Sequence, residues 1–306
     1  GGIPVTDKTT GAAAVTDANQ PKLHNQVASR RITDIAVHAL LGILAIIWVM
    51  PIVWVLLESF NKDTAPYQQT FFPTEYTLNN YVQLFTETEV LNFPRMFMNT
   101  FIVAVFTCVI SVSFVLLVSF CLSRLRFPFR RIYMNTALVL GMFPGIMAVV
   151  AIYFILKALR LTGGSTTNIA LIIVYSAGAG MTFYMMKGYM DTIPASLDEA
   201  AYLDGCSKWQ VFYLIILPIV KPMIVYQAIT GFLIPWLDFV LARAIARTQD
   251  NYTVSLGLWR MLEREYIQDW FARFAAGAVC VSIPIVILFI LMQRFYQESM
   301  AGSVKG

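Results

Sequence analysis

Apolar residues fall into long blocks along the chain and do not alternate with polar ones. Each block comes close to the ~20 residues that a helix needs to cross a bilayer. None shows the alternating ten-residue pattern of a membrane barrel, and lipid allows only helices or closed barrels as spanning structures. The pattern therefore predicts an all-α integral membrane protein. The six predicted transmembrane helices cover Ile35–Leu57, Asn99–Leu122, Ile132–Leu156, Ile169–Met190, Ile215–Val240 and Phe274–Phe295.

Composition agrees with a chain dissolved in lipid. Apolar residues make up 58% and charged residues 13%, with a mean hydropathy of +0.66, whereas soluble domains carry roughly a quarter charged residues. The net charge of +4 is spread over the flanks of the spans and does not indicate nucleic-acid binding. The four cysteines, Cys108, Cys121, Cys206 and Cys280, have no metal-ligand spacing, so they predict neither a metal site nor a disulfide.

The basic residues beside the spans predict the orientation of the chain. Arg30 and Arg31 precede the first span, and the loop 123–131 contains four arginines. The equally short loop 157–168 contains only Lys157 and Arg160. Because cytoplasmic loops are enriched in Lys and Arg, we expect both termini in the cytoplasm.

Residues 1–30 are expected to be a disordered cytoplasmic N-terminus. The first ~20 of them are rich in Gly, Ala, Thr and Asp and have no apolar core. They also lack the apolar stretch of a secretory signal. The sequence begins with Gly1, which suggests a processed start or an expression remnant. Residues 31–306 are expected to form a single membrane domain.

The predicted cytoplasmic loop of about residues 191–214 has the local chemistry of two short helices. Ser196 followed by Glu199 has the spacing of a capping box, which predicts a helix that begins directly after Ser196. Gly205 can adopt the left-handed conformation that ends such a helix. A second capping box, Ser207–Gln210, predicts a helix that runs towards the fifth span.

The first of these short helices presents small side chains on neighbouring rows. Leu197, Ala200, Ala201 and Asp204 share these rows, and the two alanines make a flat face for close approach. A helix of about two turns is marginal by itself and needs a partner to hold it. The pattern favours a plug that docks into a groove of a cytoplasmic protein. A helix that only lies on the membrane surface is the alternative.

The order and spacing of residues in this loop carry a family resemblance. Glu199-Ala200-Ala201 is followed at fixed spacing by Gly205, Ile215 and Leu217-Pro218, ahead of the penultimate helix. This series resembles the EAA loop of ABC-importer permeases. The chain is similar, over roughly residues 30–306, to carbohydrate-importer permeases, specifically those for maltose and maltodextrins. The motifs that carry this similarity are Met142-Phe143-Pro144, Met186-Lys187-Gly188-Tyr189, Asn251-Tyr252-Thr253-Val254, Phe274-Ala275-Ala276-Gly277-Ala278, Gln293-Arg294 and the ending Gly302-Ser303-Val304-Lys305-Gly306.

The resemblance implies an importer in the bacterial cytoplasmic membrane, with this chain as one of two related permease subunits. Two cytoplasmic ATPase subunits and an extracytoplasmic sugar-binding protein are the implied partners. The chain has no GxxxxGK pattern followed by Ser or Thr, so we expect ATP and magnesium to be bound by the ATPases. The chain itself is then not an enzyme and needs no cofactor. The expected cargo is maltose or maltodextrin, with another oligosaccharide or glycan as the alternative.

The resemblance also assigns candidate contacts with the ATPases. Glu199 is the expected partner of an ion pair with an ATPase subunit. The C-terminal tail, residues 296–306, is expected to reach the ATPase dimer through its final residues, Gly302, Ser303, Val304, Lys305 and Gly306. The candidate coupling residues of the loop are Glu199, Ala200, Ala201, Leu203, Asp204 and Gly205.

Special residues inside the spans leave several interpretations open. The stretch Met142, Phe143, Pro144 and Gly145 is a candidate gate or pore lining, because proline frees backbone groups and bends helices, with ordinary helix packing as the alternative. Asp238, near the outer end of the fifth span, is expected at an interface with water and not at a proton-transfer site.

The penultimate loop carries aromatic side chains with two possible roles. Tyr252, Trp259, Tyr266 and Trp270 suit either a surface that contacts the binding protein or an interfacial aromatic belt. The sequence does not decide between them.

Two other function classes fit the sequence less well. A secondary sugar carrier would usually show coupling carboxylates or internal repeats, and neither is evident. An intramembrane enzyme needs a nucleophile, a dyad or a metal set inside the spans. The only histidines are His24 and His38, and His38 enters the first span alone.

Overall fold

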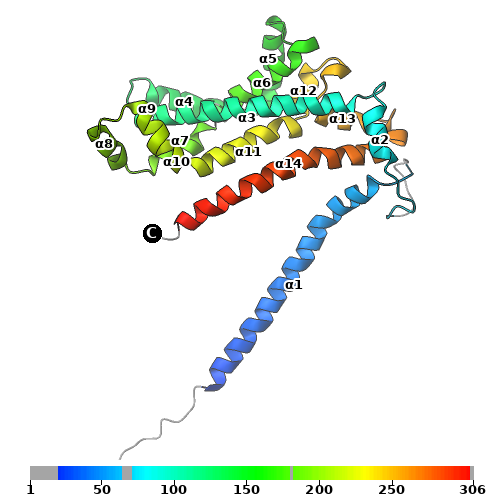
Figure 1. Cartoon of the computed structure of the whole chain (residues 1–306), viewed down its shortest axis with the longest axis horizontal. Helices are drawn as coiled ribbons and strands as arrows, with labels where there is room; N and C mark the ends of the chain where they lie inside the picture. The colour runs from blue at the N-terminus through cyan, green and yellow to red at the C-terminus, as the bar shows by residue number, and fades with distance from the viewer. Residues whose placement is uncertain (1–19, 64–70, 180–181, 304–306) are drawn as a thin grey trace, which may run out of the picture. The chain divides into compact units, whose positions relative to one another are not determined.

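The computed structural model describes residues 20–63, 71–179 and 182–303. It describes their side chains as well, except at 20–32, 179 and 294–303. Within these ranges the chain is helical and has no β-strand, as predicted for an all-α protein. It divides into two compact units, residues 1–54 and 55–306, and each is described by itself. Figure 1 shows the course of the helices.

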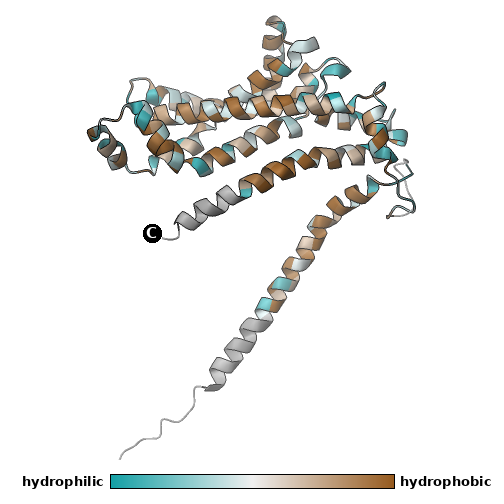
Figure 2. Cartoon of the chain, viewed as in Figure 1, coloured by the Kyte–Doolittle hydropathy of each residue, from teal (hydrophilic) through white to brown (hydrophobic). Residues whose placement is uncertain are grey.

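The first unit consists of most of α1, Gln20–Glu58. Its apolar part reaches a mean hydropathy of 2.8 and none of it is buried; Trp48, for example, is 77% exposed. Figure 2 shows the apolar surface that this helix presents. A helix that is apolar and unburied in this way is stable only in lipid or against a partner.

The start of α1 corrects one expectation. Residues 20–30, predicted as part of a disordered N-terminus, are helical, because α1 begins at Gln20. Extending an existing helix adds one hydrogen bond for each residue fixed, so a stable span can propagate into a polar flank. Residues 1–19 lie outside the described part of the chain.

The second unit contains the remaining helices, which Figure 1 labels. They are α2 Asn79–Thr86, α3 Phe93–Arg124, α4 Arg130–Gly141, α5 Gly145–Ala158, α6 Thr167–Ala179, α7 Phe183–Asp191, α8 Ala195–Leu203, α9 Lys208–Gln210, the π-helix η2 Val211–Ile216, α10 Leu217–Ile219, α11 Lys221–Leu237, α12 Val240–Ile245, α13 Val254–Met261 and α14 Ile267–Ser303, with short 3₁₀ turns at Gly164–Thr166 and Gln249–Asn251.

Among the described residues, four helices are long and apolar enough to cross a membrane, and six when each of two bent pairs counts as one span. The prediction of six spans therefore holds with two of them broken. The third breaks between α4 and α5 by 103°, and the fifth breaks between residues 208–219 and α11 by 79°. Prolines explain both breaks, because Pro144 caps α5 and Pro222 lacks the N–H that would continue the helix.

Helix α3 lies at the centre of the second unit and packs against α6, α7 and α11. Its contact with α11 depends on Gly231, where an added Cβ would come within 2.7 Å of the Ser111 hydroxyl. Small residues at such a crossing let two backbones approach closely in a membrane. The packed bundle holds the two ends of the unit in place, and the candidate sites lie at these ends.

Candidate functional site

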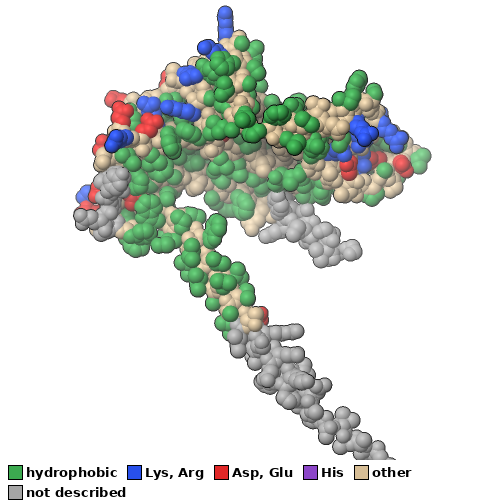
Figure 3. All heavy atoms as spheres, turned by 180° about the vertical axis from the view of Figure 1, so that it is seen from behind, with side chains coloured by type: hydrophobic (Ala, Val, Ile, Leu, Met, Phe, Trp, Pro, Cys, Tyr) green, Lys and Arg blue, Asp and Glu red, His purple; other side chains and the backbone are tan. Residues whose placement is uncertain are grey.

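The predicted coupling loop lies at one end of the second unit. Helices α8 and α9 lie at the end opposite to α2 (Figure 1). Charged side chains gather at the two ends and on the part that projects between them, while much of the remaining surface is apolar (Figure 3). The loop therefore lies at a charged end of the unit, where the apolar surface stops.

The start of α8 differs from the prediction. The helix begins at Ala195, with Pro194 as its N-cap and no capping hydrogen bond from a side chain, so the predicted capping box of Ser196 and Glu199 is wrong. Proline fixes its own φ near the helical value and starts a helix without a side-chain cap. The second box is confirmed: the Ser207 N–H donates to Gln210 Oε1 (2.7 Å) and the Gln210 N–H donates to Ser207 Oγ (3.4 Å).

Gly205 ends the first helix as predicted. Its φ is +85°, a left-handed conformation that costs a residue with a side chain about 1–2 kcal/mol. The N–H of Cys206 donates back to the Ala201 carbonyl at 2.9 Å, which is the long hydrogen bond of a Schellman motif. This turn sets the direction in which the chain leaves α8.

The inner side of α8 is packed against the bundle. Ala201 is only 6% exposed and belongs to a core cluster with Phe120 of α3, Met190 of α7 and Val211 of η2. The predicted docking face is therefore divided, because Ala201 points inward while Ala200 stays exposed. A two-turn helix needs such an anchor to remain folded.

A buried ion pair, which the sequence did not reveal, holds α8 to α3. Arg124 Nε lies 2.9 Å from Asp198 Oδ2, and the two side chains are 10% and 9% exposed. Arg124 Nη2 also donates to the carbonyl of Ile193 at 3.0 Å. Burial raises the pKa of the Asp198 carboxyl, and the Arg124 charge opposes that rise. The pair thus fixes the position of α8 on the last turn of α3.

A second polar link lies beside the first. Lys187, 8% exposed, forms an ion pair with Asp191 one turn further along α7. The Ser123 hydroxyl donates to the same carboxylate at 2.6 Å. The i, i+4 spacing of Lys187 and Asp191 is visible in the sequence, but their link to α3 is not. Together the two links join the end of α3 to the end of α7 and to α8.

The outer side of α8 is exposed in the described chain. Glu199, Ala200 and Asp204 are exposed, and Leu203 is 89% exposed. An exposed leucine beside a carboxylate and a small residue is a suitable surface for docking. Five of the six candidate coupling residues, all except Ala201, are therefore accessible.

The other candidate residues lie apart from this loop. Met142 and Phe143 are 78% and 67% exposed at the break between α4 and α5, and Pro144 and Gly145 start α5. In the tail, Gly302 and Ser303 end α14 without described side chains, and residues 304–306 lie outside the described part.

The aromatic residues of the penultimate loop do not form one surface. Tyr252 and Trp270 are each 5% exposed and belong to a core cluster with residues of α2, α3 and α14. Trp259 is 54% exposed, and Tyr266 is half-buried against the same cluster. Neither a docking surface nor an aromatic belt therefore includes Tyr252 or Trp270.

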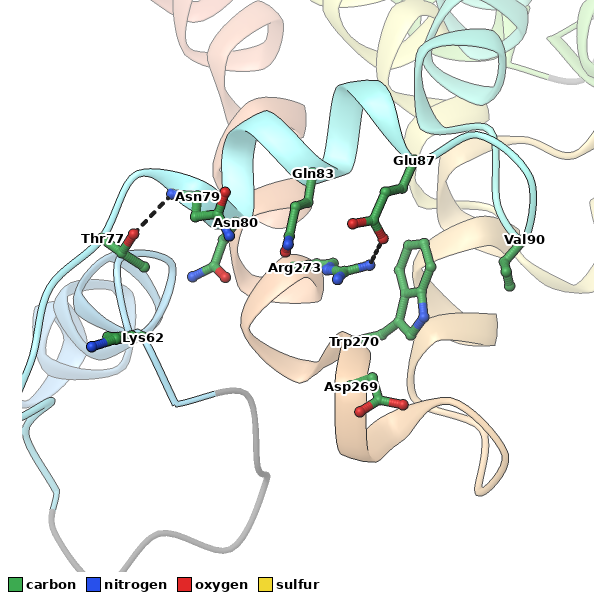
Figure 4. Close-up of a pocket in the computed structure, with 10 residues that line it drawn as sticks. All are labelled: Lys62, Thr77, Asn79, Asn80, Gln83, Glu87, Val90, Asp269, Trp270 and Arg273. Atoms are coloured by element: carbon green, nitrogen blue, oxygen red, sulfur yellow. Dashed lines mark hydrogen bonds and ion pairs between the residues drawn. The ribbon is translucent and has the colours of Figure 1, made fainter.

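A polar cavity of about 610 Å³ lies between α2 and the first turns of α14 (Figure 4). Arg273 forms an ion pair with Glu87 at 2.5 Å and lies 4.6 Å from the ring centroid of Trp270. These contacts clamp α2 onto α14. This end of the unit is therefore held by charge and stacking, and the opposite end by the Arg124–Asp198 pair.

The sequence model of the family described as "Binding-protein-dependent transport system inner membrane component" matches residues 115–300. The chain is 35% identical over 271 residues to the galactooligosaccharides transport system permease protein GanQ of Bacillus subtilis (strain 168), covering 88% of this chain and 94% of that protein. It is 31% identical over 284 residues to the maltodextrin transport system permease protein MdxG of the same strain, covering 92% and 100%.

A solved structure shares the fold. It is the crystal structure of a bacterial ABC transporter involved in the import of the acidic polysaccharide alginate, matched with a TM-score of 0.73 at 21% identity over 88% of this chain and 98% of that chain. At this level of identity the likeness supports the arrangement of helices alone.

Proposed function

Because the chain belongs to the family of binding-protein-dependent transport system inner membrane components, we propose that it is one permease subunit of an ATP-driven oligosaccharide importer and is coupled to ATP hydrolysis through α8. The helical membrane fold agrees with this assignment. The observation that carries the coupling proposal is α8 itself, with Glu199, Ala200 and Leu203 exposed on a helix that is anchored by a buried ion pair.

The proposed coupling is mechanical. An ATPase subunit that grips the outer side of α8 would pull on Asp198 and hence on Arg124 at the end of α3. Because α3 packs against α6, α7 and α11, a shift of its end reaches the centre of the bundle. Packed interiors respond to such a shift by moving as rigid elements. The Gly205 turn and the tail that ends at Gly306 are further proposed contacts with the ATPases.

The proposed complex contains partners besides this chain. This chain has no phosphate-binding loop, so ATP and magnesium are assigned to two partner ATPase subunits. The unburied apolar residues of the bend between α4 and α5, Met142 and Phe143, suit contact with a second permease subunit or with lipid. We keep the gate hypothesis for residues 142–145, because the chain bends sharply there. An extracytoplasmic binding protein completes the complex.

The proposed cargo is a neutral oligosaccharide. The two relatives described above carry names for galactooligosaccharide and maltodextrin transport, and they leave both sugars open. Maltose or maltodextrin is our first choice, since it also matches the sequence motifs, and galactooligosaccharide is the second.

The proposed orientation puts both termini and residues 191–214 in the cytoplasm, as the basic flanks of the spans indicate. Ser196 is exposed and caps no helix, so cysteine is tolerable there. Ser196→Cys should react with an impermeant thiol reagent from the cytoplasmic side only. Labelling from the outside of intact cells would reverse the orientation.

The proposed function is tested by ATPase stimulation. The complex is reconstituted with the second permease, the ATPases and the binding protein, and maltotriose, a galactotriose and an alginate trisaccharide are compared. Stimulation by one of these sugars together with the binding protein is the expected result. A complex that no sugar stimulates would contradict the assignment.

A further inference from the structure

A second cavity lies within the membrane bundle, away from the coupling loop. Its volume is about 670 Å³, and it is lined by residues of α6, α7 and α11, elements that lie together in the bundle (Figure 1). The volume is in the range of small-molecule sites. The lining includes the polar side chains of Tyr175, Tyr226, Gln227, Thr230 and Asp238. Polar side chains are costly inside a membrane unless they meet water or a ligand.

Gln227 is the residue that most directly indicates a ligand. It lies near the middle of α11 and is 6% exposed. Its Oε1 accepts a hydrogen bond from the Thr182 hydroxyl at 3.3 Å. Its amide nitrogen has no hydrogen-bond partner among the residues that the structure describes, although it lines the cavity. The amide nitrogen is not fully enclosed by protein, so it can donate a hydrogen bond to an acceptor that enters the cavity.

The neighbouring groups define the chemistry of that acceptor. Thr230 donates its hydroxyl proton to the carbonyl oxygens of Tyr226 and Gln227, at 3.0 and 3.1 Å, so its oxygen is left to accept. Tyr226 adds a ring and a phenol to the lining. A sugar hydroxyl both donates and accepts, and so it satisfies the Gln227 amide and the Thr230 oxygen together.

The single carboxylate of the cavity has other partners. Asp238 accepts hydrogen bonds from the Tyr175 hydroxyl (2.7 Å) and from the Ala242 N–H (3.0 Å), the latter at the start of α12. These bonds hold Asp238 in a structural role. The lining therefore favours a neutral, hydroxyl-rich ligand over a cation.

We propose that this cavity is a saccharide subsite on the transport path of this chain, in which the Gln227 amide donates a hydrogen bond to a sugar hydroxyl. The proposal rests on the proposed function, because it takes the transported oligosaccharide as the ligand. The proposal adds that this subunit binds the sugar directly during transport. A side chain of the second permease that fills the cavity is the competing occupant.

The test separates sugar handling from the ATPase cycle. Proteoliposomes contain the complete complex with loaded binding protein, and the probe is the radiolabelled trisaccharide of the panel that the wild type accumulates. Gln227→Leu should lower the amount of sugar imported per ATP hydrolysed by about three- to tenfold, the worth of one hydrogen bond. The stimulated ATPase rate is measured in the same vesicles, so that the loss is expressed per ATP hydrolysed and a failure of the complex to assemble is recognised. Gln227→Asn, which keeps the amide, should recover part of the loss.

The matched control is Thr107→Val, which removes a buried hydroxyl of α3 that does not line this cavity. It should import sugar with wild-type efficiency. If Gln227→Leu also imports sugar like the wild type, the subsite is wrong while the importer assignment stands. If the wild-type complex imports none of the sugars, the proposed function fails, and the saccharide subsite fails with it.

A second measurement applies even if Gln227→Leu does not assemble. Thr230→Cys, in a chain without the four native cysteines, should react with a water-soluble thiol reagent in the complex. Its labelling should fall when the complex is trapped with sugar inside. A cysteine that the reagent does not reach would show that the partner permease fills the cavity. A cysteine that reacts equally with and without sugar would show that sugar does not enter the cavity, and either result would overturn the proposal.

Discussion

Arg124 is part of the basic loop that indicates orientation, and it also forms a buried ion pair. In the sequence it is one of four arginines in a short loop and indicates only orientation. In the structure it is paired with Asp198 and bonded to the Ile193 carbonyl. Breaking a buried pair by removing one partner costs about 3–5 kcal/mol, because it leaves an uncompensated charge. Arg124 is therefore the residue whose loss should most affect the seating of α8.

We predict that Arg124→Met and Asp198→Leu each reduce co-purification of the ATPase, while the double variant recovers much of it. Both charges are gone in the double variant, so no buried charge is left without a partner. The measurement is a double-mutant cycle on ATPase binding. Arg126→Met, at an exposed position of the same loop, is the control and should bind normally. Additive losses in the double variant would mean that the two residues do not act as a pair.

The turn at Gly205 sets the direction in which the chain passes from α8 to α9. A Cβ at this position would meet nothing within 4 Å, so the φ of +85° is the only obstacle to a side chain. Gly205→Val should tilt α8, reduce ATPase docking and abolish uptake, with about 1–2 kcal/mol of backbone strain as the cause. Gly205→Asn should retain most uptake, because asparagine tolerates the left-handed region. Equal uptake by the valine and asparagine variants would contradict this explanation.

The outer side of α8 exposes Glu199, the proposed partner of an ion pair with the ATPase. Glu199→Ala should weaken ATPase docking by about tenfold, because truncation leaves the partner charge unpaired at the interface. Ser196→Ala is the matched control on the same helix, since Ser196 caps nothing in the structure. The measurement is the affinity of the membrane complex for the ATPase subunit. If the two variants bind alike, Glu199 forms no ion pair there.

Features of the loop that depend on residues close in sequence were predicted better than contacts between residues far apart in sequence. Gly205 and the Ser207–Gln210 box were predictable because the groups that interact lie within a few residues. The Ser196 box was not, because Pro194 starts the helix earlier. The pair of Arg124 and Asp198 joins residues far apart in sequence, and no periodicity shows which polar residues meet in the folded chain.

At the scale of the whole molecule, the blocks of apolar residues gave the number of spans but not their shape. Composition shows that a segment can cross the bilayer, whereas the bends of 103° and 79° depend on where Pro144 and Pro222 interrupt hydrogen bonding. The cavity beside Gln227 depends in turn on how α6, α7 and α11 meet. The sequence shows the prolines but not the angles of the bends, and the cavity is a consequence of packing, which a single sequence does not show.

The central claim is that this chain is a permease that α8 couples to ATP hydrolysis. Its most direct test is sugar accumulation in proteoliposomes that contain the complete complex, with ATP inside and binding protein outside in the matching orientation. We predict accumulation that requires ATP, binding protein and this chain together, and that Gly205→Val abolishes. Accumulation that persists without ATP, or in complexes that lack this chain, would contradict the claim.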